Sequence, residues 1–236
     1  SNEPEFAGNV KLVWEKIRRA ALRAGTDPNT IHLVAVSKTV GPAEIGMACQ
    51  YGITDCGENR VQDLLQKQKE YPHVRWHMIG HLQTNKVKDI IGRVFLVHSL
   101  DRWALAEYIE RRAEMERVVV PALLQVNVSG EKSKGGVAPH EVHDFLSGVS
   151  QFNHLQVRGL MTMAPEVDNP EETRPVFKEL RKIFDVIKRQ DVPRVEMSYL
   201  SMGMTQDFEV AIEEGANMVR VGRALFGSGL QGRLRD

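Results

Sequence analysis

Strand-like and helix-like segments alternate along almost the whole chain, and this alternation constrains the fold more than any other feature. Strand-like runs occur at 31–37, 54–58, 74–79, 94–99, 119–128, 155–163, 196–202 and 218–222. The stretches that predict helices lie at 5–24, 42–51, 60–70, 84–91, 102–116, 139–150, 171–190 and 206–214. Eight strand–helix repeats are typical of a closed parallel barrel. We therefore expect an α/β fold, a (β/α)8 TIM barrel with an extra N-terminal helix.

The repeat pattern runs from end to end without an interruption. No Pro-, Gly- or Ser-rich linker and no shift in composition marks a boundary, so we expect residues 1–236 to form one domain. An open doubly wound sheet and two half-size domains are the alternatives. The long first helix should pack outside the barrel or across its bottom. Asp101 and Thr205 stand where N-caps of the following helices are expected.

Charge and hydropathy narrow the range of partners. The chain has 31 basic and 31 acidic residues and no long run of one sign, which gives no reason to expect nucleic acid or an anionic membrane as a partner. No stretch approaches 18 consecutive apolar residues, and residues 1–4 lack a signal-peptide pattern. Cys49 and Cys56 fit neither a zinc motif nor a disulfide framework. We expect a cytoplasmic protein with a small ligand.

Lys38 follows the first strand-like run and precedes a Gly41-Pro42 turn. In barrels of this kind the functional residues lie at the C-terminal ends of the strands. Alternation puts Lys38 on the same face as Val34 and Val36, so its amine could project over the barrel mouth. Such an amine is a candidate nucleophile for a Schiff base with a carbonyl compound, if burial lowers its pKa. A solvated surface lysine is the competing interpretation.

The segments after the last two strands have the composition of a phosphate site. Residues 201–205 combine hydroxyl groups and Gly203 just before a predicted helix, whose N-terminal amides favour an anion. Gly222 and Arg223 follow the eighth strand. Glycines allow backbone amides to approach phosphate oxygens, and an arginine adds a charge-assisted contact. Two such loops, on the strands where barrels bind phosphate, predict a phosphate site.

Arg220 is expected to point into the barrel. Alternation along the last strand puts Met218, Arg220 and Gly222 on one face and the intervening valines on the other. A buried guanidinium needs a carboxylate, a phosphate or a ring nitrogen as partner. An ion pair with Glu58 competes with ligand contact as the explanation. If the ligand is the partner, Lys38 and Arg220 could flank one flat molecule.

Other polar side chains near the strand ends are weaker candidates. Asn59 and His77 are expected at the rim, and Gln125 and Asn127 in the interior; each is also consistent with a purely structural role. His77 and His81 are four residues apart, but Gly80 and the strand-like neighbours spoil the helical geometry of a HExxH zinc motif, and the intervening Glu is absent. We expect no metal site.

Five motifs, in order, resemble those of the YggS/PROSC family of pyridoxal 5′-phosphate homeostasis proteins. The resemblance spans nearly the whole chain. The motifs are Ala35-Val36-Ser37-Lys38-Thr39, Gly57-Glu58-Asn59-Arg60-Val61-Gln62, Trp76-His77-Met78-Ile79-Gly80-His81-Leu82-Gln83, Leu200-Ser201-Met202-Gly203-Met204 and Val219-Arg220-Val221-Gly222.

The resemblance implies the barrel of the alanine racemase N-terminal domain. It also implies that Lys38 holds pyridoxal 5′-phosphate as an internal aldimine and that Arg220 faces the pyridine nitrogen. Family members often have a small hydroxyl residue where this chain has Arg223. The cofactor-binding residues expected on this basis are Lys38, Asn59, His77, Ser201, Gly203, Arg220, Gly222 and Arg223. The phosphate is expected to bind around Ser201, Gly203, Gly222 and Arg223.

Physical chemistry and the resemblance agree on binding without turnover. A guanidinium beside the ring nitrogen disfavours its protonation and weakens the cofactor as an electron sink. Racemases also use a second, all-β domain and a tyrosine supplied across a dimer, and the 14 residues after Gly222 are too few to build such a domain. We expect a non-catalytic regulator of pyridoxal phosphate that affects amino-acid and keto-acid balance.

Two enzymatic alternatives stay open at this point. The first is a pyridoxal phosphate-dependent amino-acid racemase or related enzyme, with Lys38 as base and His77 as second acid. The second is a lysine Schiff-base aldolase of sugar phosphates. The resemblance suggests a monomer, and apo-enzymes that need the cofactor are candidate partners.

Overall fold

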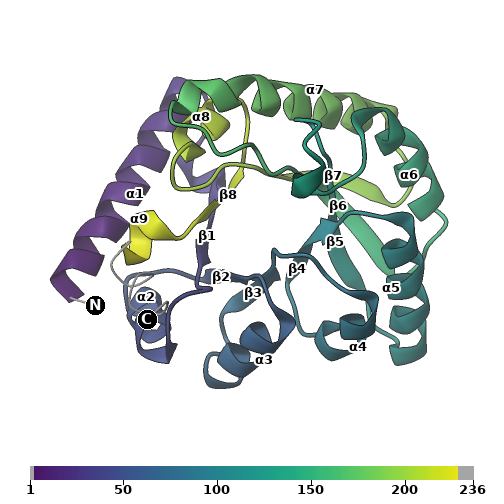
Figure 1. Cartoon of the computed structure of the whole chain (residues 1–236), viewed down its shortest axis with the longest axis horizontal. Coiled ribbons are helices and arrows are strands. Elements are labelled where there is room, and N and C mark those ends of the chain that lie inside the picture. The colour runs from purple at the N-terminus through teal and green to yellow at the C-terminus, as the bar shows by residue number, and fades with distance from the viewer. Residues whose placement is uncertain (1–2, 228–236) are drawn as a thin grey trace.

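A computed structural model describes residues 3–227, and in it eight parallel strands close into one barrel (Figure 1). The strands follow one another around the barrel in chain order, with β8 pairing back onto β1. The predicted fold class is therefore confirmed. The strands are β1 (His32–Val36), β2 (Asp55–Glu58), β3 (Arg75–Met78), β4 (Leu96–Leu100), β5 (Val120–Gln125), β6 (Leu155–Met161), β7 (Val195–Ser201) and β8 (Met218–Val221).

Helices follow the strands and form the outer layer (Figure 1). Three predicted helices begin with a separate 3-10 turn, at Thr84–Lys86, Pro139–Glu141 and Pro170–Thr173. A four-residue helix after β8 was not predicted, because it is shorter than the window over which helical periodicity can be read. The α-helices are α1 (Glu3–Arg23), α2 (Pro42–Gln50), α3 (Val61–Glu70), α4 (Val87–Ile90), α5 (Trp103–Glu116), α6 (Val142–Val149), α7 (Arg174–Gln190), α8 (Phe208–Glu213) and α9 (Arg223–Phe226).

The first helix packs on the outside of the barrel, which is one of the two positions expected for it. It lies along α8 and α9 (Figure 1). Phe6, Val10, Val13 and Ile17 are buried, at the spacing of three and four residues that gives a helix one apolar face. No helix in residues 3–227 has the length and apolar character needed to cross a membrane.

Both predicted N-caps are wrong. Helix α5 begins one residue later than expected, and the Asp101 carboxylate instead binds the Arg102 guanidinium at 2.6 Å. Helix α8 begins at Phe208, and the Thr205 hydroxyl accepts a hydrogen bond from the amide of Ala224 at 3.3 Å. In both cases another donor, the neighbouring Arg102 for Asp101 and the distant Ala224 for Thr205, competes for the side chain that would otherwise cap the helix.

Alternation along β8 sorts the side chains as predicted. Val219 and Val221 belong to the large core between the strands and the helices. Met218 belongs to a second, smaller core inside the barrel, together with Val34 and Leu96. Arg220, two residues from Met218, therefore lies on the inner face.

Candidate functional site

The loops that follow β7 and β8 lie side by side at the C-terminal end of the barrel. The amide of Arg220 donates to the carbonyl oxygen of Gly203 at 3.0 Å. The amide of Ala224, in α9, donates to the Thr205 hydroxyl across the two loops. The two segments that the sequence predicts as halves of one phosphate site are thus brought together.

These loops offer backbone donors that the protein itself does not use. Among the hydrogen bonds within residues 3–227, none uses the amide of Gly203, Gly222 or Arg223. Arg223 is exposed at the start of α9, so its side chain is also accessible. Unpaired amides on adjacent loops form the kind of concave donor set that binds phosphate. The residues present therefore fit a phosphate group.

Gly203 is required by the shape of its loop. It has a φ of +100°, and an added Cβ would lie 2.7 Å from the Cβ of Ala211 and 3.1 Å from the Cα of Phe208. We expect Gly203→Ala to lower the free energy of unfolding by about 1–3 kcal/mol and to weaken phosphate binding. Urea unfolding and titration with inorganic phosphate measure the two effects.

Gly8→Ala is the matched control for this substitution. Gly8 is exposed within α1, and an added Cβ would meet nothing within 4 Å. Alanine there should raise stability by about 0.5–1 kcal/mol and leave phosphate binding unchanged, because glycine is unfavourable inside a helix. Equal effects of the two alanines would contradict the argument from backbone conformation.

Lys38 lies next to this loop pair because of how the barrel closes. Strand β1 pairs with β2 on one side and β8 on the other, and an added Cβ on Gly222 would lie 3.4 Å from Val36. Lys38 is exposed in a turn two residues after Val36. The preceding residue, Ser37, is buried, and its hydroxyl donates to Glu58 at 2.8 Å, which anchors the turn. The exposed position differs from the burial considered at the sequence level.

The ion pair that competed as an explanation for Arg220 does not form. Glu58 is fully buried on the outer face of β2, where the Lys67 amine binds its carboxylate at 2.5 Å. Arg220 points the other way, into the barrel, with 2 % of its surface exposed. The two side chains are thus separated by the wall of the barrel, and Glu58 does not neutralise the charge of the Arg220 guanidinium.

The guanidinium of Arg220 is held by neutral groups. It donates to the hydroxyl of Ser201, to the carbonyl oxygen of Thr162 at 3.0 Å and to the sulfur of Met163 at 3.4 Å. Burial lowers the pKa of Arg220 to about 10, with the charge of Asp207 acting in the opposite direction, so the group is cationic at neutral pH. A buried cation with neutral partners favours an acceptor on a ligand.

His77 lies inside the barrel and not at the rim where it was expected. Its Nε2 lies 2.8 Å from Oδ1 of Asp55, and its Nδ1 lies 2.9 Å from Nε2 of His98. Nδ1 of His98 in turn lies 3.0 Å from the Ser201 hydroxyl. We call these four side chains, Asp55, His77, His98 and Ser201, the interior hydrogen-bond chain; it ends at Arg220.

The interior hydrogen-bond chain changes the interpretation of two predicted cofactor residues. Ser201 and His77 are both fully buried, and each is already bonded on two sides. A direct bond from either side chain to the cofactor would require it to give up one of these partners. Asp55 and His98 were not predicted as site residues, since an isolated polar residue in a strand does not reveal what lies across the barrel.

We expect stability to fall as the pH drops below about 6.5. Burial holds the pKa of His98 well below its ordinary value, so the ring stays neutral in the folded protein. The unfolded chain takes up a proton at the ordinary pKa and thus binds more protons in acid. One such group changes the free energy of unfolding by about 1.4 kcal/mol per pH unit in this window.

Urea unfolding between about pH 7 and pH 5 checks this pH dependence. His98→Asn removes the titrating ring, and the variant should show a shallower decline than the unsubstituted chain. An identical slope in the two proteins would show that the His98 ring is not the group responsible.

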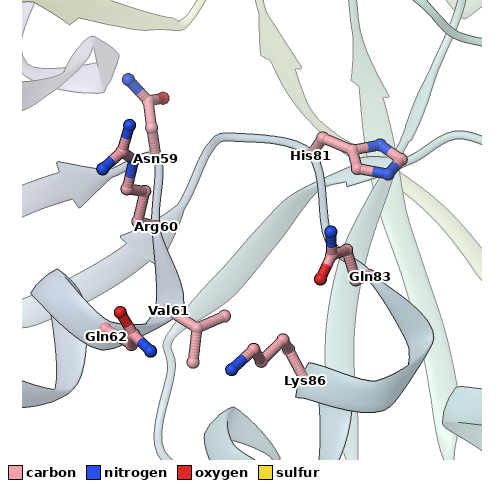
Figure 2. A pocket seen from close by; sticks show the side chains of 7 residues that line it. All are labelled: Asn59, Arg60, Val61, Gln62, His81, Gln83 and Lys86. Atoms are coloured by element: carbon pink, nitrogen blue, oxygen red, sulfur yellow. The ribbon is translucent and has the colours of Figure 1, made fainter.

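Asn59 lies at the mouth, beside a cavity of about 240 Å³ (Figure 2). Asn59 and Arg60 line one side of it, and His81 and Lys86 come from the connection between β3 and α4 on the other. The segments that follow β2 and β3 approach each other closely here. An added Cβ on Gly80 would lie only 2.3 Å from the carbonyl oxygen of Asn59. Asn59 therefore occupies the predicted rim position, and its contact with a cofactor stays a prediction.

Comparison with known proteins gives a consistent set of matches. The family model described as "Alanine racemase, N-terminal domain" matches residues 13–229. The "Pyridoxal phosphate homeostasis protein" of Aquifex aeolicus is 45% identical over 220 residues, covering 92% of this chain and 96% of that protein. The protein of the same name from Pseudomonas aeruginosa is 38% identical over 225 residues, covering 94% and 95%.

A solved structure resembles the chain over nearly its full length. PipY of Synechococcus elongatus, solved with pyridoxal phosphate bound, is 36% identical and superposes with a TM-score of 0.78. The match covers 90% of this chain and 99% of that one.

Proposed function

The chain belongs to the pyridoxal phosphate homeostasis protein family, which has the fold of the alanine racemase N-terminal domain, and we propose that it binds pyridoxal 5′-phosphate at the C-terminal mouth of its barrel. Lys38 is the residue proposed to hold the cofactor covalently. The amides of Gly203, Gly222 and Arg223 would hold its phosphate, and Arg220 would face its ring nitrogen.

One observation carries this proposal: the end of β1 lies between the ends of β2 and β8. That arrangement supports a single ligand that reaches from the exposed amine after β1 to the unpaired amides after β7 and β8. The buried guanidinium of Arg220, with only neutral protein partners, supports an aromatic nitrogen acceptor between them. A lysine, an anion site and a buried donor on adjacent strands match the aldehyde, phosphate and ring nitrogen of one small molecule.

The same residues support holding the cofactor over using it in a reaction. When bound, the cofactor supplies an aldehyde that condenses reversibly with an amine and a ring that can withdraw electrons. A fixed positive charge at Arg220 disfavours a proton on the ring nitrogen and so restrains that withdrawal. His77, the second acid of the racemase alternative, is buried and bonded to Asp55 and His98, which removes it from the mouth.

The proposed role is therefore reversible storage and supply of the cofactor, which would affect amino-acid and keto-acid balance. We also propose that the protein acts as a monomeric single-domain protein in the cytoplasm. Apo-enzymes that require the cofactor are the proposed recipients.

Two measurements on the full chain test this function. Addition of pyridoxal phosphate should produce a visible chromophore that borohydride fixes on the peptide containing Lys38. Incubation of the loaded protein with L-alanine and other L-amino acids should leave them in the L form. Robust formation of the D isomer, lost in Lys38→Ala, would instead establish the racemase alternative.

A further inference from the structure

The interior hydrogen-bond chain links side chains of β2, β3, β4 and β7 inside the barrel. Asp55 is the first residue of β2, and Ser201 is the last residue of β7. All members of the chain are buried, so each must satisfy its polar atoms within the protein. This requirement fixes the direction of every bond.

The donor and acceptor roles along the interior hydrogen-bond chain are set first at Asp55. Arg75 donates two hydrogen bonds to its carboxylate, at 3.0 and 2.8 Å. Burial opposes ionisation, but the bonds from His77 and Arg75 hold the pKa of Asp55 well below its usual value. An ionised carboxylate only accepts, so the proton of His77 must be on Nε2. Burial also lowers the pKa of His77, which leaves its Nδ1 as a bare acceptor.

The donor and acceptor roles of His98 and Ser201 follow in the same way. His98 must donate from Nε2 to the bare Nδ1 of His77, and as a neutral ring it then accepts at its own Nδ1. The hydroxyl proton of Ser201 is thereby directed to His98. Only the lone pairs of Ser201 remain for its other neighbour, and Arg220, which has donors alone, is complementary to them.

We propose that the interior hydrogen-bond chain positions Arg220 against the cofactor by fixing the orientation of the Ser201 hydroxyl. Asp55, His77 and His98 are thus positioning residues, since none of them needs to touch the ligand. This inference rests on the proposed function. It adds to that function a set of buried residues inside the barrel that determine how the ring nitrogen is contacted.

The geometry explains why the position of the guanidinium would depend on His98. With the hydroxyl proton held by His98, the Ser201 oxygen presents lone pairs to Arg220. Without His98 the hydroxyl can rotate its proton toward the guanidinium, which weakens that bond and lets the cation turn away. A more distant cation opposes protonation of the ring nitrogen less, so the cofactor should protonate at higher pH.

The first test uses the cofactor-free protein. Nitrogen-15 NMR of the histidine rings should show both His77 and His98 neutral at pH 7 or so, with the proton on Nε2. Finding His98 protonated on Nδ1 would overturn the inference, because the Ser201 hydroxyl would then be free to turn its proton elsewhere. This readout does not depend on whether any variant folds.

The second test uses substitutions of His98 in the cofactor-loaded protein. His98→Leu removes the acceptor for Ser201 and should raise the pH midpoint of the cofactor absorbance by about one unit. His98→Asn keeps an acceptor near the position of Nδ1 and should restore the midpoint to that of the unsubstituted protein. His32→Leu is the matched control, because His32 lies in β1 outside the interior hydrogen-bond chain and should leave the midpoint unchanged.

Failure of the positioning role and failure of the proposed function would give different results. His98→Leu could lose stability without a shift in the pH midpoint of the cofactor absorbance. That result would mean that the interior hydrogen-bond chain only supports the fold, and the inference would be wrong. If the unsubstituted protein shows no chromophore and no borohydride-fixed peptide, the proposed function fails, while the NMR result still decides the bond directions.

Discussion

Lys38→Ala should abolish the visible chromophore that forms with pyridoxal phosphate and should leave nothing for borohydride to fix. The amine at Lys38 is the proposed covalent partner, and alanine cannot condense with an aldehyde. Weak noncovalent binding should persist, because the amides of Gly203, Gly222 and Arg223 still offer donors to the phosphate. We expect affinity to fall by about two to three orders of magnitude, the equivalent of about 3–4 kcal/mol.

An absorption spectrum, followed by mass mapping of the borohydride-treated protein, checks this result. Lys11→Ala is the matched control, since Lys11 is an exposed lysine on α1, away from the mouth. That variant should keep the chromophore. A normal spectrum from Lys38→Ala would remove the residue on which the proposed function depends.

Arg220→Ala should destabilise the cofactor-free protein by about 2–4 kcal/mol. Arg220 is one of the largest fully buried side chains in the described part of the chain. Alanine would leave a cavity inside the barrel and would leave the Thr162 carbonyl oxygen without its donor. In the loaded protein the ring nitrogen should also protonate at higher pH, because the opposing cation is gone.

Urea unfolding without cofactor and a pH titration with cofactor separate the two effects of this substitution. Arg112→Ala serves as control, because Arg112 forms an exposed pair with Glu116 on α5. Surface pairs of this kind contribute about 0.5 kcal/mol or less. Equal stability of Arg220→Ala and Arg112→Ala would show that the interior guanidinium does not support the fold.

Several parts of the fold follow from local patterns in the sequence. The segments that form β1 to β8 were predicted within a few residues, because a strand flanked by polar turns has a clear period and length. The inward position of Arg220 followed from alternation along five residues. The position of Lys38 just after a strand was likewise predicted from the point where an apolar run ends.

The interior contacts were beyond the reach of the same reasoning. His98 and Ser201 are 103 residues apart, and His77 was expected at the rim. Local periodicity says which face of the sheet a side chain occupies. It does not say at what height it meets residues from other strands, which depends on the tilt and stagger of the closed barrel.

By itself, then, the sequence determined the alternating elements, the inner and outer faces, and the polar residues at the strand ends. Tertiary structure alone decided the partners: that Glu58 pairs with Lys67 and not with Arg220, and that Ser201 lies beneath the guanidinium. The physical reason is the range of the interactions. Propensity and amphipathicity act between neighbours in sequence, whereas a buried polar group is satisfied by whichever atoms barrel closure brings within hydrogen-bonding distance.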